Sequence, residues 1–180
     1  MATLIKNKRI APDSWQTLNT LKVAAEGVPP VPLTGDWIVP LSVWTEQRAQ
    51  LSQRKGRNGV LLENTDDPSV LEADFDKLAV IAVRFPKFTD GRGYSIARLL
   101  RRQGWKGELR AVGDVLRDQL FFMTRCGFDA FALRDDQDPQ VALTAFSDFS
   151  APYQAAIDDG VRLGTARAET QPVVSALSPW

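Results

Sequence analysis

The stretch that decides the fold class is Leu78-Ala79-Val80-Ile81-Ala82-Val83, which is apolar without interruption. Such a run suits a strand that is buried on both faces of a parallel sheet, with helices on either side. Shorter runs of similar character precede and follow it along the chain, at 37–41, 59–63, 108–112 and 129–133. The sequence therefore predicts five strands, with residues 78–83 in the middle.

Each of these runs is followed by residues at helical spacing, which indicates strand–helix units in series. The expected helices cover 42–55, 68–78, 94–104, 114–127 and 139–149, with Ser42 capping the first and Pro68 beginning the second. Five consecutive units predict an α/β fold with a parallel sheet. Five units are too few for the closed eight-stranded barrel. The expected outcomes are an open sheet, an incomplete barrel, or closure through a second chain.

The two ends of the chain differ from this regular middle, so we divide it at 1–35, 36–150 and 151–180. The first segment predicts an irregular lead-in that holds a small hairpin, with Asn7 and Lys8 at its turn, and an extended proline-rich connector at 28–32. The last segment predicts a helical turn at 155–161 and then a tail.

The overall composition excludes several classes of partner. The hydrophobic share of 44% is enough for a core, and the 22 basic and 22 acidic residues cancel. A chain without net charge has no general attraction to nucleic acid or to an acidic membrane. No apolar run approaches the roughly 20 residues of a membrane span, and the first residues do not resemble a signal peptide. We therefore expect a cytoplasmic protein without nucleic-acid or membrane partners.

Two residue types limit the chemistry, because the chain has one cysteine, Cys126, and no histidine. An internal disulfide, a Ser-His-Asp triad and a Cys/His zinc site are excluded within one chain. One thiol cannot hold an iron–sulfur cluster, and no GxGxxG follows a predicted strand. We therefore expect neither a metal nor a cofactor. For Cys126 itself, packing in the core and a redox or ligand role both stay open.

The most informative segment follows the central strand: Phe-Pro-Lys-Phe-Thr-Asp-Gly-Arg-Gly-Tyr-Ser at 85–95. Loops after parallel strands gather at one edge of the sheet, and this loop would present free amides at the start of the next helix. Its glycines permit backbone angles that other residues avoid. An anion site is one interpretation, and a simple turn and helix cap with a solvated arginine is the other. The candidate binding residues here are Arg84, Lys87, Thr89, Gly91, Arg92, Gly93 and Ser95.

The next loop, 113–119, would lie beside the first. The candidate catalytic residues are Asp90 and Asp114 for proton transfer and Tyr94 as a hydrogen-bond donor. Arg110, Asp118 and Gln119 complete the set of candidate binding residues. The alternative is that Asp114 and Asp118 only complement a helix dipole. Likewise, Arg98, Arg101 and Arg102 form either a solvated helix face or a surface for a partner.

The segments 85–95, 97–101, 107–120 and 125–131 together resemble a bacterial family, the domain of unknown function numbered 934. The resemblance extends from Leu4 to about Leu133 and is densest from Phe85 to Phe131. Members are often labelled as oxidoreductases or as accessory proteins of sulfite reduction. The resemblance thus implies a role in assimilatory sulfite reduction, beside a sirohaem reductase.

Three functional hypotheses follow. In the first, the protein is an accessory protein of sulfite reduction that binds a component of the reductase or a small anion at 85–95. In the second, it is an enzyme that acts on a small anionic substrate at the carboxyl edge of the sheet. In the third, it is a structural subunit of a homo-oligomer.

Overall fold

A computed structural model describes residues 3–18 and 31–149 of the chain. Within them lies a mixed α/β fold built on a curled, mostly parallel, eight-stranded sheet, with the strand order β2-β1-β8-β7-β6-β5-β4-β3. The strands, in chain order, are β1 (Thr3–Lys6), β2 (Arg9–Pro12), β3 (Gln16–Thr17), β4 (Trp37–Pro40), β5 (Asn58–Leu62), β6 (Val80–Phe85), β7 (Glu108–Gly113) and β8 (Ala130–Phe131).

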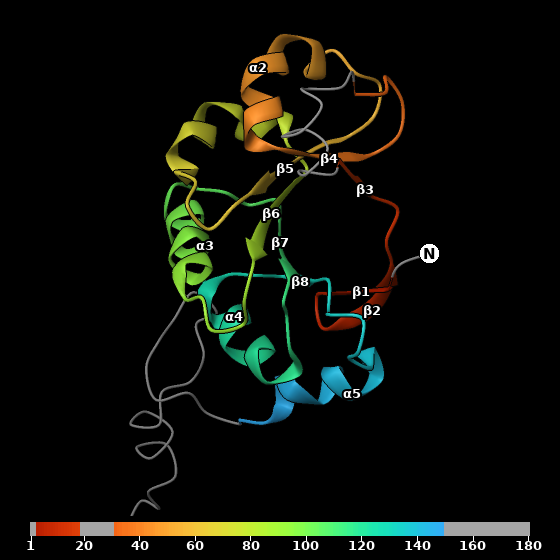
Figure 1. The fold of residues 1–180 in the computed structure, drawn as a ribbon, viewed down its shortest axis with the longest axis vertical. Coiled ribbons are helices and arrows are strands. Elements are labelled where there is room, and N and C mark those ends of the chain that lie inside the picture. Colours follow the sequence, from red (N-terminus) through yellow and green to blue (C-terminus); the bar gives the residue numbers. More distant parts are fainter. Residues whose placement is uncertain (1–2, 19–30, 150–180) are drawn as a thin grey trace, which may run out of the picture.

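The helices follow the outer side of the curve (Figure 1). They are α2 (Leu41–Leu51), the 3-10 segment η1 (Pro68–Lys77), α3 (Arg92–Arg102), the 3-10 turn η2 (Arg117–Gln119), α4 (Leu120–Cys126), α5 (Pro139–Leu143) and η3 (Thr144–Ser147). No helix in the described ranges is both long enough and apolar enough to cross a membrane.

The central prediction is confirmed in its general form: the apolar run lies in β6, which is buried and has a parallel partner on each side. The detail differs from five regular strand–helix units. A 3-10 segment stands where a helix was expected after β5, and Pro68 begins it as predicted. The predicted cap at Ser42 is wrong, because α2 already begins at Leu41, with Pro40 in the capping position.

The segment before residue 18 contributes more regular structure than predicted. The hairpin is confirmed, since β1 pairs antiparallel with β2 and Asn7 and Lys8 at its turn both have left-handed φ. β1 also pairs with β8, and β3 pairs with β4 at the other end of the strand order. The expected helical turn at 155–161 and the tail lie outside the described residues, as does most of the proline-rich connector at 28–32.

Only three residues, Asp13-Ser14-Trp15, separate β2 from β3, although these strands are the two edges of the sheet. The chain covers at most about 3.8 Å per step, so the two edges lie within about 15 Å of each other. The sheet is therefore strongly curled, and residues 13–15, which we call the strap, bridge its open side. This is the incomplete barrel among the expected outcomes, with the strap bridging the opening.

The curl gives the sheet two different faces. The large core, which includes Val83, Phe85 and Leu109, lies between the outer face and the helices. A smaller cluster of Ile38, Leu61, Val80 and Ala82 lines the concave face, with Trp15 of the strap against it. The concave face also carries Arg110, only 3% exposed, whose Nη1 lies 2.8 Å from the Oδ2 of Asp13 in the strap. Glu108 links Arg110 to Lys6 of β1 through a second and a third ion pair.

One buried carboxylate joins the first two units on the outer face. Asp74 of η1 accepts a hydrogen bond of 3.0 Å from the Trp44 indole and another of 2.9 Å from Lys77, and it pairs with Arg48. Burial acts to raise the pKa of Asp74, but the bonds from Lys77 and Trp44 and the charge of Arg48 outweigh it, so the pKa lies below its ordinary value.

We expect Asp74→Asn to lower the free energy of unfolding at pH 7 by about 2 kcal/mol, since bonds from charged groups to a carboxylate are lost. A lowered folded-state pKa means that the carboxylate stabilises the fold above its unfolded pKa of about 4, and that this stabilisation is lost as the pH falls through the folded value. The difference in the free energy of unfolding between wild type and Asp74→Asn should therefore become smaller from pH 7 towards pH 3. Urea unfolding curves at several pH values would measure it. Asp76→Asn, an exposed neighbour, is the control. A gap that stays constant with pH would contradict this account.

Candidate functional site

The loops that follow β5, β6, β7 and β8 meet at the carboxyl edge of the sheet, as the sequence predicted. Side chains link each loop to the next: Asn64 donates to Asp90 at 2.5 Å, and Arg134 donates to Asp114 at 2.9 Å. Between these two, Asp114 accepts the backbone N–H of Phe88 at 2.8 Å. The 85–95 loop is thus held from both sides.

The two candidate catalytic carboxylates are engaged in these bonds. Asp90 accepts from the Arg92 side chain at 3.0 and 2.6 Å and from the Arg92 backbone N–H at 3.1 Å. The side-chain bond to Arg92 holds the pKa of Asp90 well below its usual range. Asp114 accepts one hydrogen bond from the Phe88 backbone N–H and one from the Arg134 guanidinium. Neither oxygen pair is left free to exchange a proton with a substrate without breaking these bonds.

The third candidate, Tyr94, lies in an aromatic row instead. Its ring centroid is 5.3 Å from that of Phe85 and 5.2 Å from that of Phe122 of α4. Burial raises the pKa of the Tyr94 phenol, with the charges of Cys126 and Asp118 adding to the effect. A neutral Tyr94 at ordinary pH fits the hydrogen-bond donor role proposed for it.

The remaining candidates fall into two groups. Lys87, Thr89, Ser95 and Asp118 are exposed around the loop edge, and Gln119 donates to the Phe88 carbonyl at 2.7 Å. Arg84 and Arg110 lie apart from them, since Arg84 lines a cavity on the concave face and Arg110 pairs with Asp13 and Glu108. Arg110 therefore does not lie with the other candidate binding residues, because its guanidinium pairs with Asp13 of the strap and with Glu108.

The glycines behave differently from the prediction. Gly91 and Gly93 both have ordinary backbone angles, and Gly93 is required instead for space, since a Cβ there would lie 2.6 Å from the Phe85 ring. A Cβ at Gly91 would contact nothing within 4 Å. Gly113, which begins the neighbouring 113–119 loop, does have a left-handed φ of +96°, and a Cβ there would collide with the Phe85 carbonyl oxygen.

One residue that the sequence placed on a solvated or partner-binding face has a structural role. Arg101 is 15% exposed, and its guanidinium donates to the carbonyls of Gly127, Trp105 and Gly107, each at 2.9 Å. It also donates to Asp129 at 2.8 Å. Arg98 and Arg102 are exposed on the outer face of α3, as predicted. Cys126 is buried near the end of α4, as the core-packing alternative predicted.

An exposed aromatic patch, which the sequence did not predict, lies beside the loop. Phe88 is 49% exposed and Phe122 is 53% exposed. Gln119, which bonds to Phe88, stands just before α4 and three residues before Phe122, so both rings border the first turn of that helix. We call Phe88, Tyr94 and Phe122 the aromatic edge. The only signal in the sequence was the presence of Phe88 in the loop motif and of Phe122 in the helix expected at 114–127.

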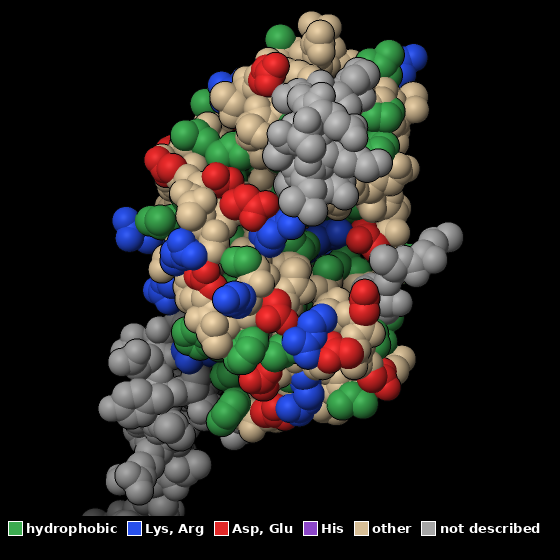
Figure 2. Space-filling view, in the orientation of Figure 1, with side chains coloured by type: hydrophobic (Ala, Val, Ile, Leu, Met, Phe, Trp, Pro, Cys, Tyr) green, Lys and Arg blue, Asp and Glu red, His purple; other side chains and the backbone are tan. Residues whose placement is uncertain are grey.

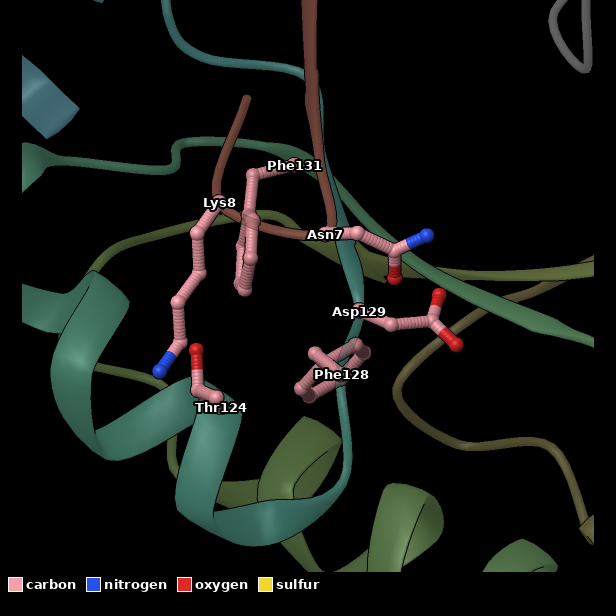
Figure 3. Close-up of a pocket in the computed structure, with 6 residues that line it drawn as sticks. All are labelled: Asn7, Lys8, Thr124, Phe128, Asp129 and Phe131. Carbon is pink, nitrogen blue, oxygen red and sulfur yellow. The ribbon is translucent and has the colours of Figure 1, made fainter. Parts of the chain in front are cut away.

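Three cavities in the described part of the chain lie away from the aromatic edge, and the one at Val31, Gln47 and Arg54 is far from the carboxyl edge of the sheet. One, of about 280 Å³, lies beyond the amino end of β8 and is lined by Asn7, Lys8, Thr124, Phe128, Asp129 and Phe131. Figure 3 shows the Lys8 amine directed towards Thr124 and the Asp129 carboxylate turned away from Lys8. Asp129 is already the partner of Arg101, and the amino ends of parallel strands more often serve stability than function.

The second cavity, of about 240 Å³, lies on the concave face at the carboxyl end of the strands. Its described lining is Thr17, Ile38, Leu61, Ala82, Arg84, Val112 and Gly113. In Figure 2, acidic and basic side chains are interspersed over the visible face, and basic side chains are recessed near its centre. Within residues 3–18 and 31–149, no group of three or more Asp, Glu or Cys side chains is arranged to hold a metal ion.

Comparison with known proteins gives one match. A family model described as "Bacterial protein of unknown function (DUF934)" matches residues 59–163. The match begins at β5 and takes in the 85–95 loop, the aromatic edge and all the loops that meet there. No curated protein and no solved structure matches the chain.

Proposed function

The chain belongs to the DUF934 family of bacterial proteins, and from that premise we propose that it is a cytoplasmic accessory protein of assimilatory sulfite reduction that binds a component of the reductase. The observation that supports a binding role is the state of the 85–95 loop. The Asp90 carboxylate and the Phe88 backbone of this loop are held by neighbouring loops, while the Phe88 ring of the loop and the Phe122 ring of α4 face the solvent.

A surface of this kind suits association with another protein. Exposed aromatic rings supply much of the binding energy at protein interfaces, and a preformed loop loses little entropy on binding. Exposed charged residues of both signs lie near the aromatic edge: Lys87 precedes Phe88 on the loop, Arg98 lies one turn beyond Tyr94 on α3, and Asp118 lies just before α4. The partner surface that fits is apolar at its centre and carries complementary charges at its rim.

Catalysis on a small anionic substrate at this edge has less support. Arg92, the cation that would hold the anion, already pairs with Asp90. The bonds to Asp90 and Asp114 would have to break before either could act as a base. A proton-transfer role needs a group whose pKa lies near the working pH, and that of Asp90 is displaced downward from an already acidic value.

The test is capture of the partner from cells grown on sulfate as the sulfur source. Wild-type protein carrying an affinity tag should recover a component of the sulfite reductase, and Phe88→Ala combined with Phe122→Ala should reduce the recovery about tenfold or more. Val70→Ala, which shortens an equally exposed apolar side chain on η1, should leave it unchanged.

Two results would count against the proposal. Equal recovery by the double variant would remove the aromatic edge as the binding surface. Recovery of no reductase component, together with normal sulfite reduction in a deletion strain, would remove the role in sulfite reduction altogether. Light scattering on the purified protein would measure its oligomeric state, and so would show whether the protein associates with itself.

A further inference from the structure

The cavity on the concave face has the composition of a binding site for a small amphipathic molecule. Four aliphatic side chains, Ile38, Leu61, Ala82 and Val112, form much of its described lining. The strand registers bring them together, since Leu61 pairs with Ala82 in the β5–β6 ladder and Val112 pairs with Arg84 in the β6–β7 ladder. Pockets of this kind, apolar with a few polar groups, are typical of sites for small organic ligands.

The position of the cavity also favours a ligand. It lies where the parallel strands β4 to β7 end, inside the curl of the sheet. In barrels and open α/β sheets, ligands bind at the carboxyl ends of the strands. The strap and the ion pairs of Arg110 lie nearer the middle of β7, so the concave face is filled there and hollow at its carboxyl end.

Arg84 supplies the charge. Its Nε atom is shielded from solvent and makes no hydrogen bond, although it lies 3.2 Å from a carboxylate oxygen of Glu63. The side chain is 35% exposed, and Glu63 is its only ion-pair partner within residues 3–18 and 31–149. A guanidinium that has one carboxylate partner among the described residues and lies at the rim of an apolar cavity is suited to a further acid group.

From these features we infer that the concave cavity binds a short aliphatic carboxylate, with its hydrocarbon body against Leu61, Ala82 and Val112 and its carboxylate on Arg84. This site is separate from the aromatic edge, and its occupancy does not depend on a reductase partner. Glu63 competes with the ligand for Arg84, because both present a carboxylate to the same guanidinium.

The experiment is calorimetric titration of the full-length protein with hexanoate, with hexanamide as the uncharged analogue of the same length. Wild type should bind hexanoate and should bind hexanamide about tenfold more weakly or worse, since only the acid uses the charge of Arg84. Arg84→Gln should lose the preference for the acid, and Arg98→Gln, which alters an exposed arginine on α3, should keep it.

Two further variants separate the cavity from a surface effect. Ala82→Val adds methyl groups within the cavity and should weaken the binding of both hexanoate and hexanamide. Thermal unfolding would show whether the variant remains folded. Glu63→Gln removes the competing carboxylate and should tighten hexanoate binding without altering that of hexanamide. Failure of hexanoate to bind wild type, equal affinity for acid and amide, unchanged binding to Arg84→Gln, or no gain from Glu63→Gln would each overturn the assignment.

Discussion

Arg101→Lys should lower the free energy of unfolding by about 3 kcal/mol, although it keeps the charge. The guanidinium of Arg101 satisfies three backbone carbonyls and the Asp129 carboxylate at once. A lysine ammonium is a single point with a different reach, so it cannot occupy all four positions. Carbonyls at the end of α4 and in the segment before β7 would then lose their donor in a largely buried place, which is the costly part.

The control for this variant is Arg98, which lies about one helical turn before Arg101 on α3. Arg98→Lys should change the free energy of unfolding by less than about 0.5 kcal/mol, because Arg98 is exposed on the outer face of α3. Urea unfolding followed by circular dichroism would compare the two. Equal effects at positions 98 and 101 would show that the bonds of Arg101 do not stabilise the fold beyond an ordinary surface arginine.

The second large effect is expected for Gly113→Ala, which should lower the free energy of unfolding by about 3 kcal/mol. Two costs combine there. The φ of +96° is unfavourable for any residue with a side chain, and the new Cβ would collide with the carbonyl oxygen of Phe85 on the adjacent strand. The backbone of β6 or β7 would have to shift, and both strands lie at the centre of the sheet.

Gly91→Ala is the matched control for this change. Gly91 has an ordinary φ of −80°, and a Cβ there would meet nothing within 4 Å. Thermal unfolding should therefore place Gly91→Ala close to wild type and Gly113→Ala far below it. If the two variants unfold together, the left-handed backbone and the close approach at Gly113 do not carry the stated cost.

The sequence predicts best those features that depend on neighbouring residues. The apolar run in β6, the start of η1 at Pro68 and the hairpin turn at Asn7 and Lys8 follow from burial, fixed φ and turn preference. The gathering of the loops at one edge follows from parallel topology. These expectations needed no knowledge of distant contacts.

The features that escaped prediction depend on distant partners. Arg98, Arg101 and Arg102 look alike in the sequence, and Arg101 differs only because its position on α3 brings it to carbonyls and a carboxylate that lie up to 28 residues further along the chain. Arg110 was expected near the loop edge but pairs with Asp13, 97 residues away. Gly113, unlike Gly91 and Gly93, is constrained by a strand beside it and not by its own motif.

The strap has a consequence for how the protein is made. During translation β1 is made before its partner β8, which begins at Ala130. The edge of β1 that pairs with β8 therefore stays unpaired until most of the described residues have been made. Contacts between residues so far apart in the sequence form slowly, and until then the β1–β2 hairpin exposes an unpaired strand edge. The strap then carries β3 to β4 on the opposite edge. Closure of the curled sheet is therefore a late event in biosynthesis, because β1 can pair with β8 only after Ala130 and Phe131 have been made.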